Sequence, residues 1–334
     1  MLYVTTRNHQ EAFTISHVLT QNRGSDGGLY VPLNFPKLTA QERNRLSGLS
    51  FGQCVAEMLN LFFSTKLTGW DLDFSIGRYP VRLEELAHRI LMAETWHNPD
   101  WQYRRLERNL MELLHAETEL SGNWVSVAVR MAVLTGILGL QETGPVDVAV
   151  VSGDFTLPIS AWYLRKMGFP VGNIICCCNE NHPFWDLICN GQMRTDGCSI
   201  ATIVPEADIT LPVNLERLIS ACGGVPETER YLHCCRTGSA YSVSDSMLQE
   251  LRQGLYVCVV SSDRIENTIP NVYKSHNYVL SPSSALAYSG LLDYRAKTGV
   301  IRNAIVFCDQ SPVCTAETVA RVMDIPVAEL KKML

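Results

Sequence analysis

Short apolar runs alternate with segments of helical periodicity from residue 109 onward. The runs that predict buried strands are residues 109–114, 146–151, 173–178, 255–260 and 304–308. The segments that predict helices are residues 121–140, 155–167, 182–190, 213–221, 281–297 and 315–323. Apolar strands separated by helices are typical of a mostly parallel sheet that helices cover on both faces. We therefore predict a doubly wound α/β fold, with residues 223–244 as the least regular region.

The pattern before residue 109 predicts a mainly helical N-terminal region. Thr39 is placed to cap a helix that runs to Leu46, and residues 51–63 repeat apolar side chains on one helical face. Residues 83–93 show similar spacing, which predicts a third amphipathic helix. The glycine-rich segment 24–32 predicts a turn that leads into an apolar strand.

Length and composition limit the class of protein. A chain of 334 residues fits one large domain or two ordinary ones, and the change of pattern divides it into residues 1–108 and 109–334. Hydrophobic residues make up 46% and charged residues 19%, as in a soluble globular protein. With 28 basic against 34 acidic residues, the chain has no dense basic face, so nucleic acid is not an expected partner.

The location that the sequence predicts is the cytoplasm. The first residues show no basic start followed by an apolar run, so no secretory signal is visible. The most apolar long stretch, residues 124–140, carries Arg130 and is shorter than a typical membrane-spanning helix. A buried helix, and no membrane contact, is the expectation.

The twelve cysteines are expected to be reduced thiols. Residues 176–178 are three consecutive cysteines, whose side chains point to alternating faces if the segment is extended, so they cannot converge on one ion. We predict no metal site, and interpret these residues as small buried hydrophobic side chains.

Polar residues follow two of the predicted strands, where open α/β sheets bind ligands. The candidate ligand-binding residues are Ser152, Gly153, Asp154, Phe155, Thr156, Asn179 and Asn181. The first five form a turn between a strand and a helix, which is also a common simple connection. The two asparagines could equally cap the helix that follows them.

Three residues are weak catalytic candidates, namely His115, Asp154 and His182. His115 could act as a general base beside Glu112, although a histidine on an apolar strand is more often a core or rim residue. Glu216 and Arg217 are interpreted as a structural ion pair at a helix start. Residues 261–263 are interpreted as a turn and helix cap, and no GxSxG motif marks a hydrolase serine.

Five segments resemble, in the same order, those of the threonine synthase family. Residues 151–192 contain SGDF, KMGFP and NEN, which are similar to the family's SGNFG, KKMGLP and NEN, and include Gly191 at the glycine of the family's TG. The other four segments are TTRN…SDGGLYVP (5–32), ADITLPVNLERLI (207–219), YVLSPSSALAY (278–288) and VFCDQSPVCTAETV (306–319). The resemblance covers most of the chain. It implies the fold of type II pyridoxal-phosphate (PLP) enzymes, which in this family convert O-phosphohomoserine to threonine and phosphate.

The resemblance also implies that the PLP lysine is missing. The family's lysine motif, LELFHGPTLAFKD, matches MELLHAETELSGN (111–123), where Glu112, Leu113, His115 and Thr118 are kept. Gly122 then falls on the lysine, and Asn123 on the aspartate that follows it. Glycine has no side-chain amine, so residue 122 cannot form the Schiff base with PLP.

Other cofactor-binding positions differ from the family pattern. Asp154 replaces the asparagine and Thr156 the second glycine of SGNFG, the loop that binds the PLP phosphate in the family. We expect weaker phosphate binding, because a carboxylate repels phosphate and a β-branched residue restricts close approach. The remaining changes are Ser281 and Ser283 for the Asp and His of DPHTA, and Asp309 and Ser311 for the Thr and His of TAHPAKF.

The family's smaller domain is also missing by this comparison. In the family it separates the lysine segment from SGNFG, whereas here only residues 122–152 lie between them, enough for one helix and one strand. Closure of two domains around a substrate would then be lost.

The sequence therefore predicts a non-catalytic binding or interaction protein without PLP. It would bind itself as a homodimer, a complete threonine synthase, or a small anion or amino acid near residues 152–156. One alternative is an enzyme of altered chemistry that does not use PLP. The other is retained PLP-dependent lyase activity through a different lysine, such as Lys274. The apolar helix within 122–140 must be buried, either in the sheet domain or in the dimer interface.

Overall fold

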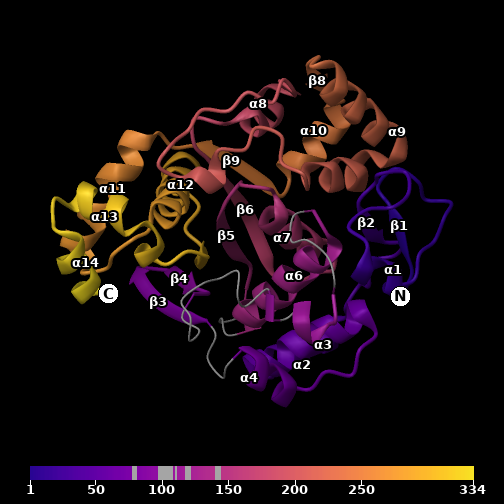
Figure 1. Cartoon of the computed structure of the whole chain (residues 1–334), viewed down its shortest axis with the longest axis horizontal. Coiled ribbons are helices and arrows are strands. Elements are labelled where there is room, and N and C mark those ends of the chain that lie inside the picture. The colour runs from indigo at the N-terminus through magenta and orange to yellow at the C-terminus, as the bar shows by residue number, and fades with distance from the viewer. Residues whose placement is uncertain (77–80, 97–107, 110, 117–121, 140–143) are drawn as a thin grey trace.

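In the part of the chain that the structure describes, six strands form the central sheet in the order β3-β4-β10-β5-β6-β9 (Figure 1). The computed structural model describes residues 1–76, 81–96, 108–109, 111–116, 122–139 and 144–334. The six strands are β3 (Arg82–Ala87), β4 (Ile90–Glu94), β5 (Val146–Val151), β6 (Val171–Cys178), β9 (Leu255–Val259) and β10 (Ala304–Cys308). Every neighbouring pair is parallel except β3 and β4. The doubly wound, mostly parallel sheet predicted from the sequence is confirmed.

Two short sheets lie outside the central one. The N-terminal sheet pairs β1 (Tyr3–Thr5) with β2 (Tyr30–Pro32), and the other pairs β7 (Gln192–Met193) with β8 (Tyr241–Ser242). The helices of the N-terminal region are α1 (Ile15–Thr20), α2 (Ala40–Ser47), α3 (Phe51–Phe63) and α4 (Gly69–Ile76). Those that follow are α6 (Trp124–Gly139), α7 (Thr156–Lys166), α8 (Pro183–Asn190), α9 (Leu215–Thr237), α10 (Asp245–Arg252), α11 (Ser262–His276), α12 (Pro282–Thr298), α13 (Ala316–Met323) and α14 (Val327–Met333). The 3₁₀ helices are η1 (Pro205–Ala207) and η2 (Pro312–Thr315).

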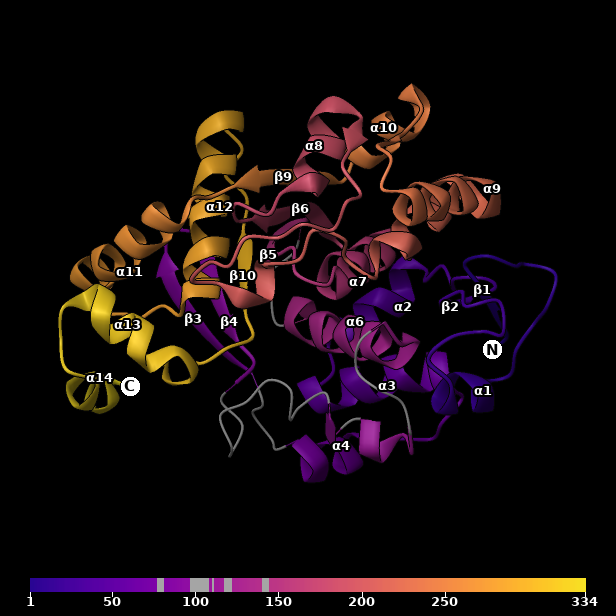
Figure 2. The same cartoon turned by 45° about the horizontal axis from the view of Figure 1, so that its top comes forward.

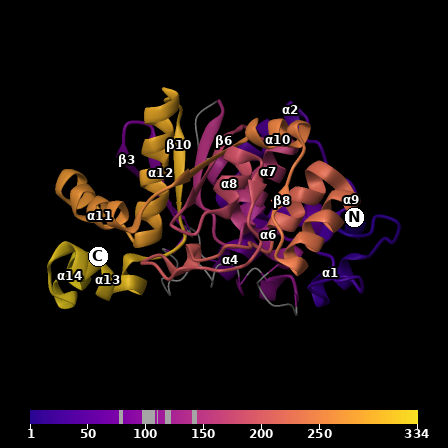
Figure 3. The same ribbon diagram turned by 90° about the horizontal axis from the view of Figure 1, so that it is seen from above.

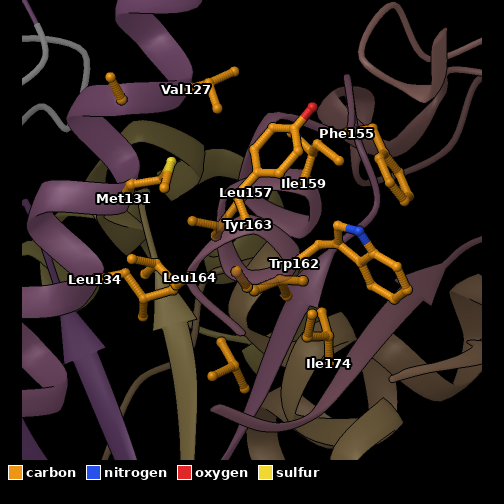
Figure 4. Packing of buried hydrophobic residues seen from close by; sticks show 14 of the residues in the cluster. Val127, Met131, Leu134, Phe155, Leu157, Ile159, Trp162, Tyr163, Leu164 and Ile174 are labelled. Atoms are coloured by element: carbon orange, nitrogen blue, oxygen red, sulfur yellow. The ribbon is translucent and has the colours of Figure 1, made fainter. Parts of the chain in front are cut away.

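Alternation along the strands gives the sheet two buried faces. In β6, Ile174 and Cys176 belong to one core cluster, whereas Ile175 and Cys177 belong to the other. The first cluster includes α6 and α7, whose side chains interlock in Figure 4, and the second includes α11, α12 and α13. Figure 2 shows α12 along the sheet, away from α6 and α3. This arrangement explains why the central strands are apolar on both faces at most positions.

Local sequence signals explain several helix boundaries. Thr39 caps α2 in a capping box with Glu42, and Ser50 does the same for α3 with Gln53. Both helices lie where the sequence predicts them. The predicted strands 146–151, 173–178, 255–260 and 304–308 correspond to β5, β6, β9 and β10.

The helix predicted over residues 83–93 is wrong, because this segment forms the β3–β4 hairpin. Its apolar positions also fit two strands joined at Arg89, which has a left-handed φ of 59°. β4 is held as a strand by parallel pairing with β10. Both strands belong to the central sheet although they precede residue 109, and the domain boundary drawn there stays a prediction.

Two further expectations are corrected. Residues 111–113, in the run predicted as a strand, are helical, and the preceding residue 110 lies outside the described part. Residues 223–237, expected to be irregular, continue α9 beyond a kink at Gly224. The kink follows from the non-helical φ of 68° at Gly224 and from Pro226, which cannot donate a backbone hydrogen bond.

The apolar helix α6 is buried within the chain. Every residue from Trp124 to Leu138 except Arg130 is buried, against α3 on one side and α7 on the other. Of the two burial sites considered for this helix, the structure therefore supports the core. The homodimer stays a prediction, and α6 does not provide its surface.

Gly290 lets α12 approach the sheet at two cysteines. A Cβ atom at Gly290 would lie 2.3 Å from Cys177 Sγ and 2.6 Å from Cys258 Sγ. We expect Gly290→Ala to lower the free energy of unfolding by about 1–3 kcal/mol through overpacking. Denaturant unfolding measures this loss, and adding Cys177→Ala should recover part of it. Gly139→Ala is the control, because its Cβ meets only ordinary contacts at 3.5 Å and beyond; an equal loss in both alanine variants would contradict the prediction.

Candidate functional site

The turn between β5 and α7 holds the five consecutive ligand-binding candidates. Gly153 and Phe155 both have left-handed φ angles, 44° and 66°, which turn the chain sharply from the strand into the helix. Phe155 is fully buried and packs edge-to-face against Phe184 of α8, with ring centroids 4.7 Å apart. The core therefore fixes the backbone of this turn.

The Asp154 carboxylate is bonded inside the turn. Asp154 Oδ1 accepts a hydrogen bond from the Thr156 backbone N–H at 2.9 Å, and Oδ2 accepts one from Thr156 Oγ1 at 2.7 Å. Asn214 reaches the same turn, because its Nδ2 donates to Thr156 Oγ1 at 2.8 Å and its backbone N–H donates to the Asp154 carbonyl. Asn214 was not among the sequence candidates, although it lies in the LPVNLER segment.

Gly122 occupies a confined position. It is buried with a left-handed φ of 77°, and a Cβ atom there would lie 3.0 Å from Val213 Cγ2 and 3.6 Å from Leu29 Cδ2. Its carbonyl accepts a hydrogen bond from Arg217 at 3.1 Å. The next residue, Asn123, caps α6 by accepting from the Ser126 backbone N–H at 2.7 Å. The residue before Gly122 and Thr118 lie outside the described residues.

Arg217 is a buried cation that joins three segments. Besides Gly122, it donates two hydrogen bonds to the Tyr30 carbonyl of β2, at 3.0 and 3.1 Å, and one to Asn214 Oδ1. Burial lowers the pKa of Arg217 to about 10, so the guanidinium remains charged at neutral pH. In Figures 1 and 3 the start of α9 lies next to the N-terminal segment.

Glu216 and Arg217 do not pair with each other, which corrects the sequence-based interpretation. Glu216 accepts two hydrogen bonds from Arg7, both at 3.0 Å, and one from Thr6. Adjacent helical residues point in different directions, so each one contacts a different segment. Their structural role at the start of α9 is nevertheless as expected.

The two candidate asparagines after β6 bind the chain itself. Asn179 Nδ2 donates to Asp208 Oδ1 at 2.7 Å, and Asn181 Nδ2 donates to the same oxygen at 3.0 Å. Asn181 Nδ2 also donates to the Ile200 carbonyl, and Asn181 Oδ1 accepts from the Ile200 backbone N–H. Asn179 Oδ1 accepts from the Asn181 backbone N–H. These hydrogen bonds hold residues 200–208 against the end of β6. They give both asparagines a structural role that needs no ligand.

Two of the three serines at the changed family positions, Ser281 and Ser311, cap helices. Ser281 Oγ accepts from the Ser284 backbone N–H at 3.2 Å at the start of α12, and Ser311 Oγ accepts from Val313 at 3.2 Å before η2. Beside them, burial raises the pKa of Glu206, and the nearby charge of Asp309 raises it further.

The three weak catalytic candidates form no recognisable catalytic group. His115 is exposed in a turn, with a left-handed φ of 52°, rather than on a strand. His182 precedes α8, where its Nδ1 lies 3.7 Å from Asp186. Within the described ranges, no hydrogen bond or ion pair joins any two of His115, Asp154 and His182.

An open cavity of about 790 Å³ lies between the N-terminal segment and the second half of α9. Its lining residues are Arg7, Asn8, Asp26, Pro226, Glu229, Arg230, Leu232, His233 and Arg236. Among its lining cations, Arg7 is paired with Glu216 and Arg230 with Glu227.

No metal or membrane site is found in the described residues. No group of three or more His, Cys, Asp or Glu side chains there is arranged to hold a metal ion. The consecutive cysteines of β6 are buried, and burial raises their pKa values. None of the helices described here has the length and apolar character needed to cross a membrane.

Comparison with known proteins gives related sequences. Residues 2–78 match the family model described as the threonine synthase N terminus. Human threonine synthase-like 1 is 29% identical over 147 residues, which is 43% of this chain and only 20% of that protein's length. Threonine synthase from Pseudomonas aeruginosa is 22% identical over 404 aligned positions, covering 90% of this chain and 86% of that protein.

Comparison with solved structures gives the same fold. PLP-bound threonine synthase from Brucella melitensis superposes with a TM-score of 0.85 at 17% identity, covering 97% of this chain and 92% of that one. Yeast threonine synthase also reaches 0.85, at 16% identity, covering 99% and 93%. The N-terminal family model, the curated relatives and the fold thus all point to the same resemblance: this chain is similar to threonine synthases and threonine synthase-like proteins, and it has their fold.

Proposed function

We propose that this chain is a non-catalytic threonine synthase-like protein that acts by binding and does not form a Schiff base with PLP. The observation that carries the proposal is Gly122, which stands where the family resemblance places the lysine. PLP acts as an electron sink in enzymes that attach it through a lysine amine, and Gly122 has no amine to supply.

The backbone around Gly122 supports the same conclusion. Its left-handed φ and the 3.0 Å distance from a Cβ atom to Val213 leave little room for any side chain. The nearby cation, Arg217, is occupied with backbone carbonyls and remains protonated, so it is no substitute amine. The residues present do not fit an attached PLP, and we assign no catalytic step to it.

The loss of a second domain also supports a non-catalytic role. Between Gly122 and Ser152, the described residues form only α6 and β5. A cleft closed by a smaller domain would need more chain between these points. Whether the binding partner is a second copy, a complete threonine synthase or a small ligand stays a prediction.

Retained PLP chemistry would require another lysine. Lys274 is exposed near the end of α11, and Lys166 pairs with Glu250 at 2.7 Å on the surface of α7. An exposed lysine lacks the enclosed surroundings that direct PLP chemistry. Nothing in the described contacts favours the other alternative, PLP-independent catalysis by His115, Asp154 and His182.

The test is attachment of PLP to the purified chain. We expect no aldimine absorbance after incubation with PLP, and no single lysine modified after borohydride reduction and peptide mapping. A complete threonine synthase treated in parallel is the positive control. A saturable adduct at one lysine, with Lys274 the first to inspect, would contradict the proposal; low labelling spread over several lysines is the expected background and agrees with it.

A further inference from the structure

Several backbone donors at the start of α7 are bonded within the chain. The Phe155 N–H donates to the Ser152 carbonyl at 2.8 Å, and the Ile159 N–H donates to the Phe155 carbonyl at 3.1 Å. The Thr156 N–H donates to the Asp154 carboxylate at 2.9 Å, and Pro158 has no N–H. Helix starts bind phosphate through backbone N–H groups that have no partner within the chain. No such group is available at residues 155, 156, 158 and 159.

Other parts of the chain enclose this turn. A Cβ atom at Gly153 would lie 3.2 Å from the backbone oxygen of Glu206, so η1 packs closely over the turn. Asn214, at the N-cap of α9, donates to Thr156 Oγ1, and Thr156 is fully buried. The bonds within the turn therefore form part of a packed structure.

We infer that the Asp154 carboxylate occupies the position at the start of α7 that the phosphate of an external ligand would need. The carboxylate supplies a negative charge beside the positive end of the helix and accepts two short hydrogen bonds there. A second anion would have to displace these bonds and approach a like charge. The inference deepens the proposed absence of PLP, since it removes phosphate binding as well as the Schiff base.

The position of Asp154 separates this role from ordinary helix capping. The residue at the N-cap of α7 is Phe155, whose side chain makes no capping bond. Asp154 precedes it and binds the first helical N–H from outside the helix. A glycine in place of Asp154 would leave that N–H without this acceptor, whereas here it is already bonded.

The experiment compares inorganic phosphate binding by the unchanged chain and by Asp154→Ala. Line broadening in the ³¹P NMR spectrum reports binding directly, and the Tm in phosphate against chloride at equal ionic strength reports its effect on stability. We expect no specific phosphate response from the unchanged chain. Asp154→Ala should lower the Tm by about 2–4 °C in chloride, and phosphate should raise it again with increasing concentration.

Asp245→Ala is the matched control, because Asp245 is an exposed carboxylate in the first turn of α10. It should respond to phosphate no more than the unchanged chain does. Phosphate binding by the unchanged chain would overturn the inference even if Asp154→Ala did not fold. A folded Asp154→Ala without a phosphate response would overturn it too. Inorganic phosphate has no aldehyde, so neither outcome depends on whether a lysine forms a Schiff base.

Discussion

Gly122→Lys is expected to destabilise the protein without restoring the PLP site. The left-handed φ of 77° costs a side chain about 1–2 kcal/mol, and the Cβ atom lies 3.0 Å from Val213 Cγ2, which adds crowding. We expect a loss of about 2 kcal/mol or more in the free energy of unfolding, measured by denaturant titration. Incubation with PLP should give no aldimine absorbance, because the phosphate position at α7 is also occupied by the Asp154 carboxylate.

Two alanine variants separate the causes of this loss. Gly122→Ala introduces the Cβ atom without the amine and should account for most of the destabilisation. Gly238→Ala is the matched control, since Gly238 has a φ of 66° and no atom within 4 Å of its added Cβ. The prediction fails if Gly122→Lys is as stable as the unchanged chain, or if it binds PLP to saturation as an aldimine.

The sheet could be predicted from the sequence because its central strands are mostly apolar. In β5 and β6, side chains on both faces are buried, so the local pattern and the final environment agree. The β3–β4 hairpin could not be predicted from the sequence, because the spacing of its apolar residues also fits a helix. Its identity comes from β4 pairing with β10, a strand more than 200 residues away in the chain.

The candidate site was predictable only in part. The bond from Thr156 to Asp154 could be predicted, because an aspartate side chain commonly accepts a hydrogen bond from the backbone two residues further on. Pro158, which lacks an N–H, is also visible in the sequence. The confinement of Gly122 is not visible, because it depends on Val213 and on a left-handed backbone. Likewise, adjacent Glu216 and Arg217 suggest an ion pair, but their partners lie in the N-terminal region and at Gly122.

Arg217→Ala is expected to destabilise the protein strongly. The guanidinium is fully buried and donates to the Tyr30 and Gly122 carbonyls and to Asn214 Oδ1. Removing it leaves these three acceptors without that donor in the interior, and each buried unsatisfied polar group costs about 1–3 kcal/mol. We expect a loss of about 3 kcal/mol or more in the free energy of unfolding, together with looser attachment of the N-terminal region to α9.

Denaturant unfolding measures the loss, and limited proteolysis tests whether the N-terminal region is released first. Arg217→Lys should recover little stability, because one ammonium cannot reproduce the planar guanidinium bonds to separate carbonyls. Arg45→Ala is the control, since Arg45 and its partner Glu57 are exposed at 57% and 43% of their side chains. Its loss should be smaller, because water can reach the carboxylate that it leaves. If Arg217→Ala costs no more than Arg45→Ala, the buried arginine is not what joins β2, Gly122 and α9.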